Sequence, residues 1–266
     1  MLELVHVSCG YGGDIVLKDV SVTINGGELV GVIGPNGSGK TTLMRVATKV
    51  IRPAAGEVRL EGRELSTMSY RELATRVAVV GPVDQGLDTR TEDLVLLGRI
   101  PLRERYRILD GKTDADAARQ AMRVTGLLHL KDRPVSTLSS GERQLAFVAR
   151  ALAQEPKLLL LDEPTSHLDI RHQIALLDLV TKLNRKKGLT VVMILHDLNL
   201  ASQYCGRLLL MDKGRLHSDG PPESVLTRET IEKVYRTPVV VLNGPLCSKP
   251  FIRPVSREGG LESDPY

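Results

Sequence analysis

Residues Gly34–Thr42 read G-P-N-G-S-G-K-T-T and directly follow the apolar run Leu29–Ile33. The stretch fits the phosphate-binding pattern G-x-x-x-x-G-K-[ST]. Glycines let backbone N–H groups close around a phosphate, because no Cβ blocks the approach. A helix that begins near Lys40 would also point the positive end of its dipole at the phosphates. The pattern predicts a strand, a loop for a nucleoside triphosphate and a helix, and a glycine-rich turn that merely contains a lysine is the less favoured alternative.

Several residues of this loop have specific predicted contacts. Lys40 would meet the β- and γ-phosphates, and Thr41 would place its hydroxyl on a magnesium ion. The predicted nucleotide-binding residues of the loop are Gly34, Pro35, Asn36, Gly37, Ser38, Gly39, Lys40, Thr41 and Thr42.

Short apolar runs alternate with helical patterns along the chain, which is typical of an α/β domain with a largely parallel sheet. Other segments alternate apolar and polar residues, which predicts antiparallel strands with one face in water. The predicted parallel strands are Leu29–Ile33, Val77–Val80, Leu158–Leu161, Thr190–Leu195 and Leu208–Met211, and the predicted antiparallel strands are Leu2–Val7, Val16–Ile24 and Glu57–Leu60.

The long segment between Val80 and Leu158 has helical periodicity, and Thr113 with Asp116 resembles a capping box. We expect an inserted helical subdomain at about residues 86–155 of a domain that covers residues 1–245. Beyond Asn243 the sequence turns to proline, glycine and isolated charges, which predicts weak internal packing in a C-terminal extension at residues 246–266.

Composition narrows the class of protein. The 266 residues provide ample material for a core, and a net charge of +4 is too mild to argue for a nucleic-acid partner. Cys9, Cys205 and Cys247 show no C-x-x-C spacing, so a reducing cytosol fits better than a disulfide framework or a zinc site. The N-terminus lacks a signal-peptide pattern, and the apolar runs are far shorter than the ~20 residues that span a bilayer. Action at a membrane would need another chain that crosses it.

Asp162 and Glu163 follow the buried run Leu158–Leu161, at the edge where α/β sheets place ligands. Asp162 is the predicted magnesium ligand, since magnesium usually takes one or two carboxylates plus phosphate oxygens. Glu163 is the candidate that polarises the attacking water. A D-E pair in a surface turn is the alternative, but the preceding leucines and the phosphate loop favour the functional interpretation.

Residues Leu138–Gln144 read L-S-S-G-E-R-Q. Ser139 and Glu142 form an S-x-x-E capping box, which alone explains much of the pattern. In a chain that also has the phosphate loop, the segment closely resembles the signature motif of ATP-binding cassette (ABC) proteins.

The resemblance to ABC proteins extends over nearly the whole chain. Tyr11 resembles the aromatic residue that stacks on adenine, and His196 resembles the switch histidine that contacts the γ-phosphate and the catalytic glutamate. The stretch S-H-L-D resembles the D-loop, with Ser166, Leu168 and Asp169 as its matched residues. The resemblance implies a P-loop NTPase (RecA-like) core with an antiparallel β subdomain and an inserted α-helical subdomain, and catalytic roles for Glu163 and His196.

An ABC protein of this kind is implied to form a head-to-tail homodimer that holds two ATP molecules with Mg²⁺. Each nucleotide would lie between one chain's phosphate loop and the partner's signature helix. The hydroxyl of Ser139, the backbone of Gly141 and the helix N-terminus can supply donors to a γ-phosphate. The residues implied to face the partner's nucleotide are Ser139, Ser140, Gly141 and Glu142.

The stretches T-S-H-L-D-I-R-H-Q and L-H-D-L-N-L-A-S-Q-Y-C most resemble the ATPase subunits of importers for iron siderophores, heme and cobalamin. Such subunits sit at the cytoplasmic face of the membrane beneath two copies of a separate multi-spanning permease, and an external binding protein delivers the metal chelate. Nucleic acid is not an expected partner. Substrate choice lies in the binding protein and permease, so the resemblance implies the chelate class as a whole.

Two positions depart from the family pattern. Ser140 stands where the family usually has glycine, which a negative φ would tolerate. After Val77–Val80 the chain reads G-P-V-D-Q, so Pro82 occupies the usual place of the Q-loop glutamine, and Gln85 is the nearest substitute for its role in the metal shell.

Two other function classes compete with the importer. A soluble cassette ATPase that acts on ribosomes or nucleic acid would usually have paired cassettes or long coiled-coil insertions, which this sequence lacks. A P-loop kinase or GTPase has no use for L-S-S-G-E-R-Q. His167 and His172 are five residues apart, which does not suit the i, i+4 metal pair, and we expect structural roles for both.

Overall fold

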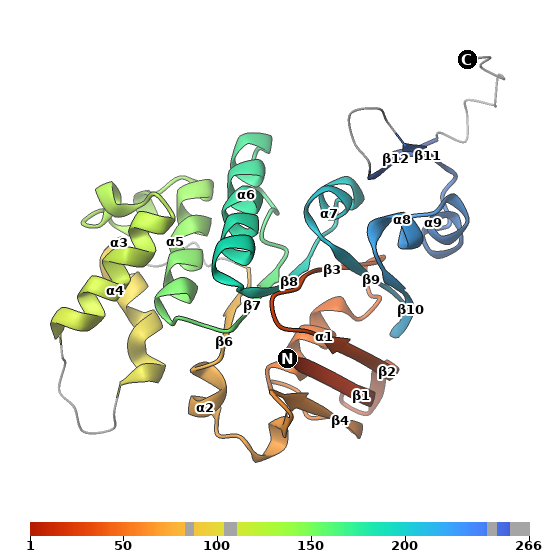
Figure 1. Ribbon diagram of the computed structural model, residues 1–266, viewed down its shortest axis with the longest axis horizontal. Helices are drawn as coiled ribbons and strands as arrows, with labels where there is room; N and C mark the ends of the chain where they lie inside the picture. The colour runs from red at the N-terminus through yellow and green to blue at the C-terminus, as the bar shows by residue number, and fades with distance from the viewer. Residues whose placement is uncertain (83–87, 104–110, 244–248, 256–266) are drawn as a thin grey trace.

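The computed structural model describes residues 1–82, 88–103, 111–243 and 249–255. At its centre is a six-stranded sheet in the order β10-β9-β3-β8-β7-β6 (Figure 1). Strands β9, β3, β8, β7 and β6 pair in parallel, and β10 pairs antiparallel with β9. The strands are β3 (Leu29–Ile33), β6 (Val77–Val80), β7 (Leu158–Asp162), β8 (Thr190–Ile194), β9 (Arg207–Asp212) and β10 (Arg215–Gly220). The five predicted parallel strands are confirmed.

The central sheet is covered on both faces, because its strands are apolar at successive positions. In β7, Leu159 and Leu161 face one hydrophobic cluster, whereas Leu158 and Leu160 face a second. All four leucine side chains are buried. A strand that is apolar at every position is stable only between two layers. The polar Asp162 follows these leucines and lies at the carboxyl end of the strand.

A second sheet, in the order β2-β1-β4-β5, packs one face on the second cluster together with helix α1 (Lys40–Ala47). Its pairings are antiparallel, which confirms the alternating patterns. Three strands extend further than predicted: β1 (Leu2–Tyr11), β2 (Asp14–Ile24) and β4 (Ala55–Leu60). The short β5 (Arg63–Glu64) was not predicted.

Three helices gather beyond β6 as the inserted helical subdomain (Figure 1). They are α3 (Thr91–Leu96), α4 (Gly111–Val124) and α5 (Ser140–Ala153), and the short α2 (Tyr70–Ala74) precedes β6. The expected helix start at Thr113 is wrong, since Thr113 lies inside α4, which is already helical at Gly111, the first described residue of this segment. Asp114 in its first turn pairs with Arg99 at 3.0 Å and with Arg103 at 2.9 Å, so ion pairs hold this helix end.

Four further helices complete the described fold: α6 (Ile170–Lys187), α7 (Leu198–Tyr204), α8 (Pro222–Val225) and α9 (Arg228–Tyr235). Strands β11 (Val239–Asn243) and β12 (Pro250–Pro254) form an antiparallel hairpin against α7. Ile252 is buried in the first cluster. Residues 250–254 are therefore better packed than their composition predicted, and the domain boundary at residue 245 stays a prediction.

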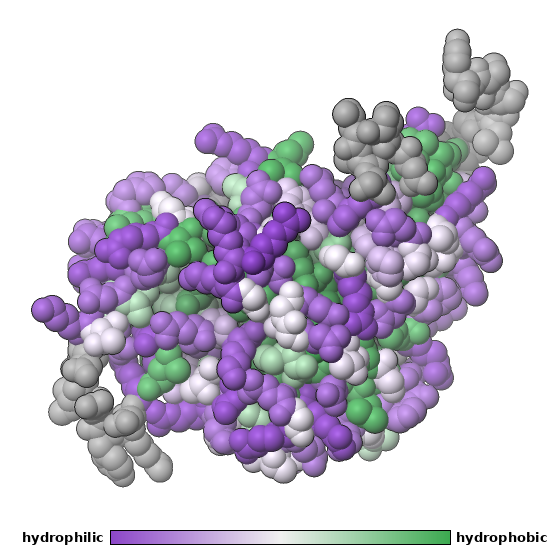
Figure 2. Space-filling model, viewed as in Figure 1, coloured by the Kyte–Doolittle hydropathy of each residue, from purple (hydrophilic) through white to green (hydrophobic). Residues whose placement is uncertain are grey.

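No helix among the described residues is both long and apolar enough to cross a membrane. Hydrophilic side chains cover most of the face in Figure 2, with smaller apolar areas between them.

Candidate functional site

The phosphate loop links the end of β3 to the start of α1 and has the conformation that its glycines permit. Gly39 caps α1 with a φ of 100°, in the left-handed region. A Cβ on Gly34 would lie 2.2 Å from the carbonyl oxygen of Met211 on β9. The path of the loop therefore requires glycine at both positions.

Lys40 lies folded over this loop. Its Nζ donates to the carbonyl oxygens of Gly34 at 2.8 Å and Pro35 at 2.9 Å, and the residue is only 6% exposed. Burial lowers the pKa of Lys40, against the opposing attraction of Glu163 and Asp162. The ammonium is thus held inside the loop, where phosphate oxygens could replace the two carbonyls as acceptors.

Asp162, the last residue of β7, has a carboxylate that is only partly hydrogen-bonded. Burial and the neighbouring charge of Glu163 raise its pKa, although a hydrogen bond from Thr41 opposes them. Its Oδ1 is buried without a hydrogen-bond partner among the described residues, and so is the hydroxyl of Ser38 in the phosphate loop. Unpaired hard oxygens beside a phosphate loop are suitable ligands for a small divalent cation.

Glu163 and His196 are in direct contact, although 32 residues lie between them in the chain. His196 Nε2 is 2.6 Å from Glu163 Oε1. Glu163 has a φ of 52°, an uncommon conformation for a residue with a side chain. The hydroxyl of Ser166 is 3.4 Å from Glu163 Oε2, so D-loop and carboxylate are adjacent. The structure brings the two predicted catalytic residues together, and their roles stay predictions.

The signature segment begins α5 through the predicted capping box. Ser139 Oγ accepts from the Glu142 backbone N–H at 3.3 Å, while the Glu142 carboxylate accepts from the Ser139 N–H at 2.9 Å and hydroxyl at 2.8 Å. Ser140 is the first residue of the helix and has no positive φ, so its Cβ is tolerated. The Ser139 hydroxyl is already occupied by Glu142 and would have to exchange that acceptor for a phosphate.

A cavity of about 330 Å³ lies between the signature helix, the two carboxylates and the D-loop. Gly81 and Pro82 also border it, so the start of the predicted Q-loop reaches the site. Gln85 lies outside the described residues. The lining residues are Gly81, Pro82, Ser140, Arg143, Gln144, Asp162, Glu163, Ser166, His167 and Leu168.

Tyr11, at the end of β1, is 45% exposed, as a residue that stacks on a base must be. Its hydroxyl accepts a hydrogen bond of 2.9 Å from Arg45 of α1, whose guanidinium lies 5.9 Å from the ring centroid. Sequence reasoning missed Arg45, because no local pattern links it to a tyrosine 34 positions away.

Asp169 of the D-loop caps α6 rather than pointing away from it. Its Oδ1 accepts from the His172 backbone N–H at 2.9 Å and lies 2.8 Å from His172 Nδ1. A Cβ on Gly141 would lie 2.3 Å from His172 Cδ2. The His172 ring therefore packs directly on the signature glycine, a contact that sequence spacing did not indicate.

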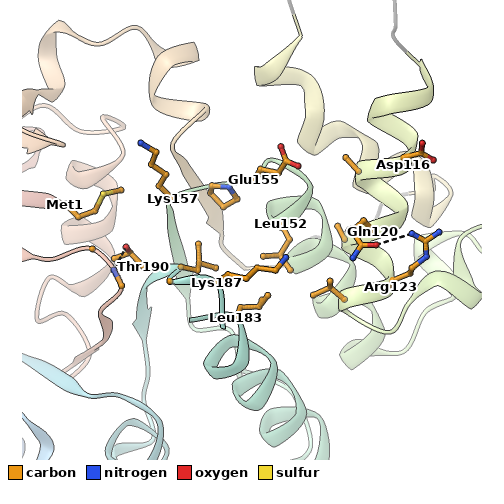
Figure 3. A pocket seen from close by; sticks show the side chains of 18 residues that line it. Met1, Asp116, Gln120, Arg123, Leu152, Glu155, Lys157, Leu183, Lys187 and Thr190 are labelled. Carbon is orange, nitrogen blue, oxygen red and sulfur yellow. Dashed lines mark hydrogen bonds between the residues drawn. The ribbon is translucent and has the colours of Figure 1, made fainter. Parts of the chain in front are cut away.

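A larger cavity of about 1030 Å³ lies at the opposite edge of the sheet, where β7 and β8 begin. Figure 3 shows Gln120 and Arg123 of α4 on one side and Met1 and Thr190 on the other. Charges of both signs line it, including those of Glu155 and Lys187, so no ligand charge is favoured. Its place at the starts of the parallel strands separates it from Asp162.

Comparison with known proteins agrees with this geometry. A family model described as ABC transporter matches residues 17–166. The chain is 39% identical to the ferric enterobactin transport ATP-binding protein FepC of Escherichia coli strain K12, over 95% of this chain and 93% of that protein. It is 38% identical to the petrobactin import ATP-binding protein FpuC of Bacillus anthracis, over 99% of this chain and 97% of that protein.

Among solved structures, a protein described as a metal-chelate type ABC transporter in an inward-facing conformation has a TM-score of 0.84 to this chain. The match covers 97% of this chain and 98% of the other, at 27% sequence identity.

Proposed function

The chain belongs to the ABC transporter family, and on that premise we propose that it is the ATP-binding and ATP-hydrolysing subunit of an importer for a metal chelate. The observation that carries the proposal is the contact of 2.6 Å between Glu163 and His196 beside the phosphate loop. The names of the two import relatives support the direction of transport, and the matched metal-chelate type structure supports the substrate class. Iron siderophores, heme and cobalamin are the chelates that the family resemblance implies.

The chain's own residues account for nucleotide binding. The loop backbone and the dipole of α1 would receive the β- and γ-phosphates. Lys40 would exchange its two carbonyl acceptors for phosphate oxygens, which keeps a buried ammonium paired throughout. Tyr11 would stack on the adenine ring.

A magnesium ion fits the residues present. Thr41 and Asp162 would hold it, since Asp162 offers a buried carboxylate oxygen that lacks a hydrogen-bond partner in the described structure. When bound, the ion would neutralise charge that develops on the phosphate oxygens. The same charge would return the pKa of Asp162 toward its usual range. That Gln85 joins the metal shell stays a prediction.

Glu163 would orient and activate the attacking water, and His196 would position Glu163. The carboxylate orients the water and accepts its proton, and the imidazole holds the carboxylate at one oxygen. The second oxygen lies near the Ser166 hydroxyl, so both ends of the carboxylate are positioned. In-line attack on the γ-phosphate depends mainly on this positioning.

ATP would join two copies of the chain head to tail. Ser139 and Gly141 at the start of α5 would meet the γ-phosphate on the partner's loop, because a helix N-terminus presents unpaired N–H donors. Loss of the γ-phosphate removes the group that both subunits hold, so hydrolysis would open the dimer.

A groove beside the site supports docking to a permease. Val50, Tyr70 and Val79 are 69%, 65% and 41% exposed and border a cavity of about 520 Å³ together with Pro82. Exposed apolar side chains that gather around a groove mark interaction sites. We infer a peripheral location beneath two permease copies, with an external binding protein that acts through them.

The solution mass of Glu163→Gln, measured with and without magnesium-ATP, tests the composite site. Blocked hydrolysis should trap the nucleotide-bridged dimer, and the variant should bind ATP with near-normal affinity while hydrolysing it slowly. Glu229→Gln changes a carboxylate of α9 and should behave like the unmodified chain. Full ATPase activity in Glu163→Gln would remove that glutamate from the mechanism. A monomer that still binds ATP would contradict ATP-driven closure of the isolated subunits.

A further inference from the structure

Two motifs that are separate in the sequence touch through one histidine. The D-loop residue Asp169 accepts the His172 backbone N–H and contacts its Nδ1 at 2.8 Å, and the ring lies on Gly141 of the signature segment. This contact joins the N-terminus of α6 to the N-terminus of α5. Neither the capping of α6, which the Asp169 carboxylate performs with a backbone N–H alone, nor ATP binding to the phosphate loop needs the ring.

The His172 ring has a neighbour on each of two sides, Asp169 and Gly141. The backbone hydrogen bond from His172 lowers the pKa of Asp169, as does its side-chain hydrogen bond, so the carboxylate is an ionised acceptor. Nδ1 must therefore carry the hydrogen that it shares with Asp169. The opposite side of the ring then faces Gly141, where a Cβ would lie 2.3 Å from Cδ2 and 3.0 Å from Nε2.

The same contacts continue toward the predicted catalytic carboxylate. The Ser166 backbone N–H donates to the Glu163 carbonyl at 3.1 Å, and its hydroxyl reaches Glu163 Oε2 at 3.4 Å. The short turn from Ser166 ends at Asp169, which holds His172. A series of contacts thus runs from Glu163 to the signature glycine within one chain.

We propose that His172 is a positioning residue that sets the signature segment of each subunit in register with its own D-loop. The inference rests on the proposed function, in which the signature segment meets the partner's nucleotide. A shift of the D-loop would move the ring, and the ring would move Gly141, because the ring already lies on that glycine. The state of one nucleotide site would thereby change how the signature segment contacts the nucleotide in the other site.

The test compares variants in the Glu163→Gln background by ATP-driven dimerisation. His172→Ala should raise the protein concentration needed for half-dimerisation about tenfold, a moderate coupling. The affinity of the free subunit for a fluorescent ATP analogue and the melting temperature should both stay close to those of the parent. His172→Gln can still donate to Asp169 and should recover part of the loss. Lys182→Ala, an exposed change further along α6, is the matched control.

A double-mutant cycle separates this role from a structural one. Asp169→Ser keeps a side-chain oxygen that can cap α6 but loses the carboxylate that holds Nδ1. It should weaken dimerisation as His172→Ala does, and the double variant should be no weaker than either single variant, since both changes remove the same contact. Dimerisation of His172→Ala at the parent's concentration would overturn the inference alone. If His172→Ala lost stability and ATP affinity to the same extent as dimerisation, the role of His172 would be merely structural, and the inference would also be overturned. A parent that stays monomeric with ATP would contradict the ATP-joined dimer on which the inference rests.

Discussion

At the scale of single residues, the site is built from groups in unfavourable environments. Asp162 is a carboxylate raised in pKa by burial and by Glu163, and its Oδ1 has no hydrogen-bond partner among the described residues. Burial lowers the pKa of the Lys40 ammonium. Such environments oppose folding and are retained where a ligand needs the charge.

Asp162→Asn should therefore stabilise the nucleotide-free protein while it weakens magnesium-dependent nucleotide binding. A carboxylate whose folded pKa is raised destabilises the fold at neutral pH, and the penalty disappears as the pH falls through that pKa. The melting temperature should rise by roughly 1–3 °C at neutral pH, with the gain shrinking toward acid. Scanning calorimetry at several pH values measures this, with the exposed Asp88→Asn as control. A lower melting temperature for Asp162→Asn at neutral pH would contradict the argument.

Lys40→Ala should abolish measurable ATP binding, since it removes the cation that two loop carbonyls hold in place for phosphate. Isothermal titration calorimetry checks the binding, and circular dichroism checks the fold. Lys182→Ala, an exposed change on α6, is the lysine control. Near-normal ATP affinity in Lys40→Ala would show that the loop binds phosphate without this side chain.

At the scale of elements, one of the two predicted capping boxes is confirmed and the other is wrong. The box at Ser139 and Glu142 forms as predicted, with both reciprocal hydrogen bonds present. The similar pattern at Thr113 does not start a helix, since Thr113 already lies within α4. A capping box acts over four residues, whereas the ion pairs of Asp114 reach Arg99 in η2 (Leu97–Leu102) and Arg103 just after it. These contacts join Asp114 to a segment that the local pattern does not include.

The ion pairs of Arg99 should control the acid stability of the helical subdomain. Burial alone would raise the pKa of Asp114, but hydrogen bonds from Arg99 and Arg103 outweigh it and lower the pKa. A lowered folded pKa contributes stability that is present above the ordinary value and is lost as the pH falls through the folded pKa. The side chains of Arg99 and Asp114 are only 10% and 14% exposed.

Arg99→Met should cost about 3 kcal/mol at neutral pH, because it leaves a nearly buried carboxylate with one partner and the Ala153 carbonyl without its buried hydrogen bond from Arg99. The loss of stability from about pH 6 to about pH 3 should become shallower than in the unmodified chain. Urea unfolding at several pH values measures both effects. Arg103→Met, whose side chain is 34% exposed, should cost less. Equal costs for the two variants would argue against burial as the cause.

At the scale of the whole molecule, the C-terminal hairpin is tied to the helix that follows His196. Asn199 of α7 donates to the Ile252 carbonyl at 3.1 Å and accepts the Ile252 N–H at 2.7 Å. Ser202 donates to the buried Pro250 carbonyl at 2.7 Å. These bonds fasten β12 to the core, where composition alone suggested an extension with weak packing.

Asn199→Ala should lower the free energy of unfolding by about 1–3 kcal/mol, because it leaves two partly buried backbone groups of Ile252 unpaired. Chemical denaturation measures the change, and ATP affinity should vary little, since the lost amide touches neither the phosphate loop nor Asp162. Gln203→Ala removes an exposed side chain of the same helix and serves as the control. An unchanged unfolding free energy would mean that these two hydrogen bonds add nothing to the stability of the fold.

By itself, the sequence determined the features that depend on contiguous residues. The parallel strands, the glycine loop before α1 and the capped start of α5 follow from runs of apolar side chains, backbone freedom and reciprocal hydrogen bonds within a few positions. The family followed from the order of those motifs.

Only the tertiary structure decided which distant side chains meet. Arg45 on Tyr11, His196 on Glu163 and the His172 ring on Gly141 result from how helices and strands pack around two hydrophobic clusters. Packing also buried Ile252, in a segment whose proline and glycine content suggested otherwise. Local propensities act over a few residues, whereas burial and contact between remote segments depend on the closed chain as a whole.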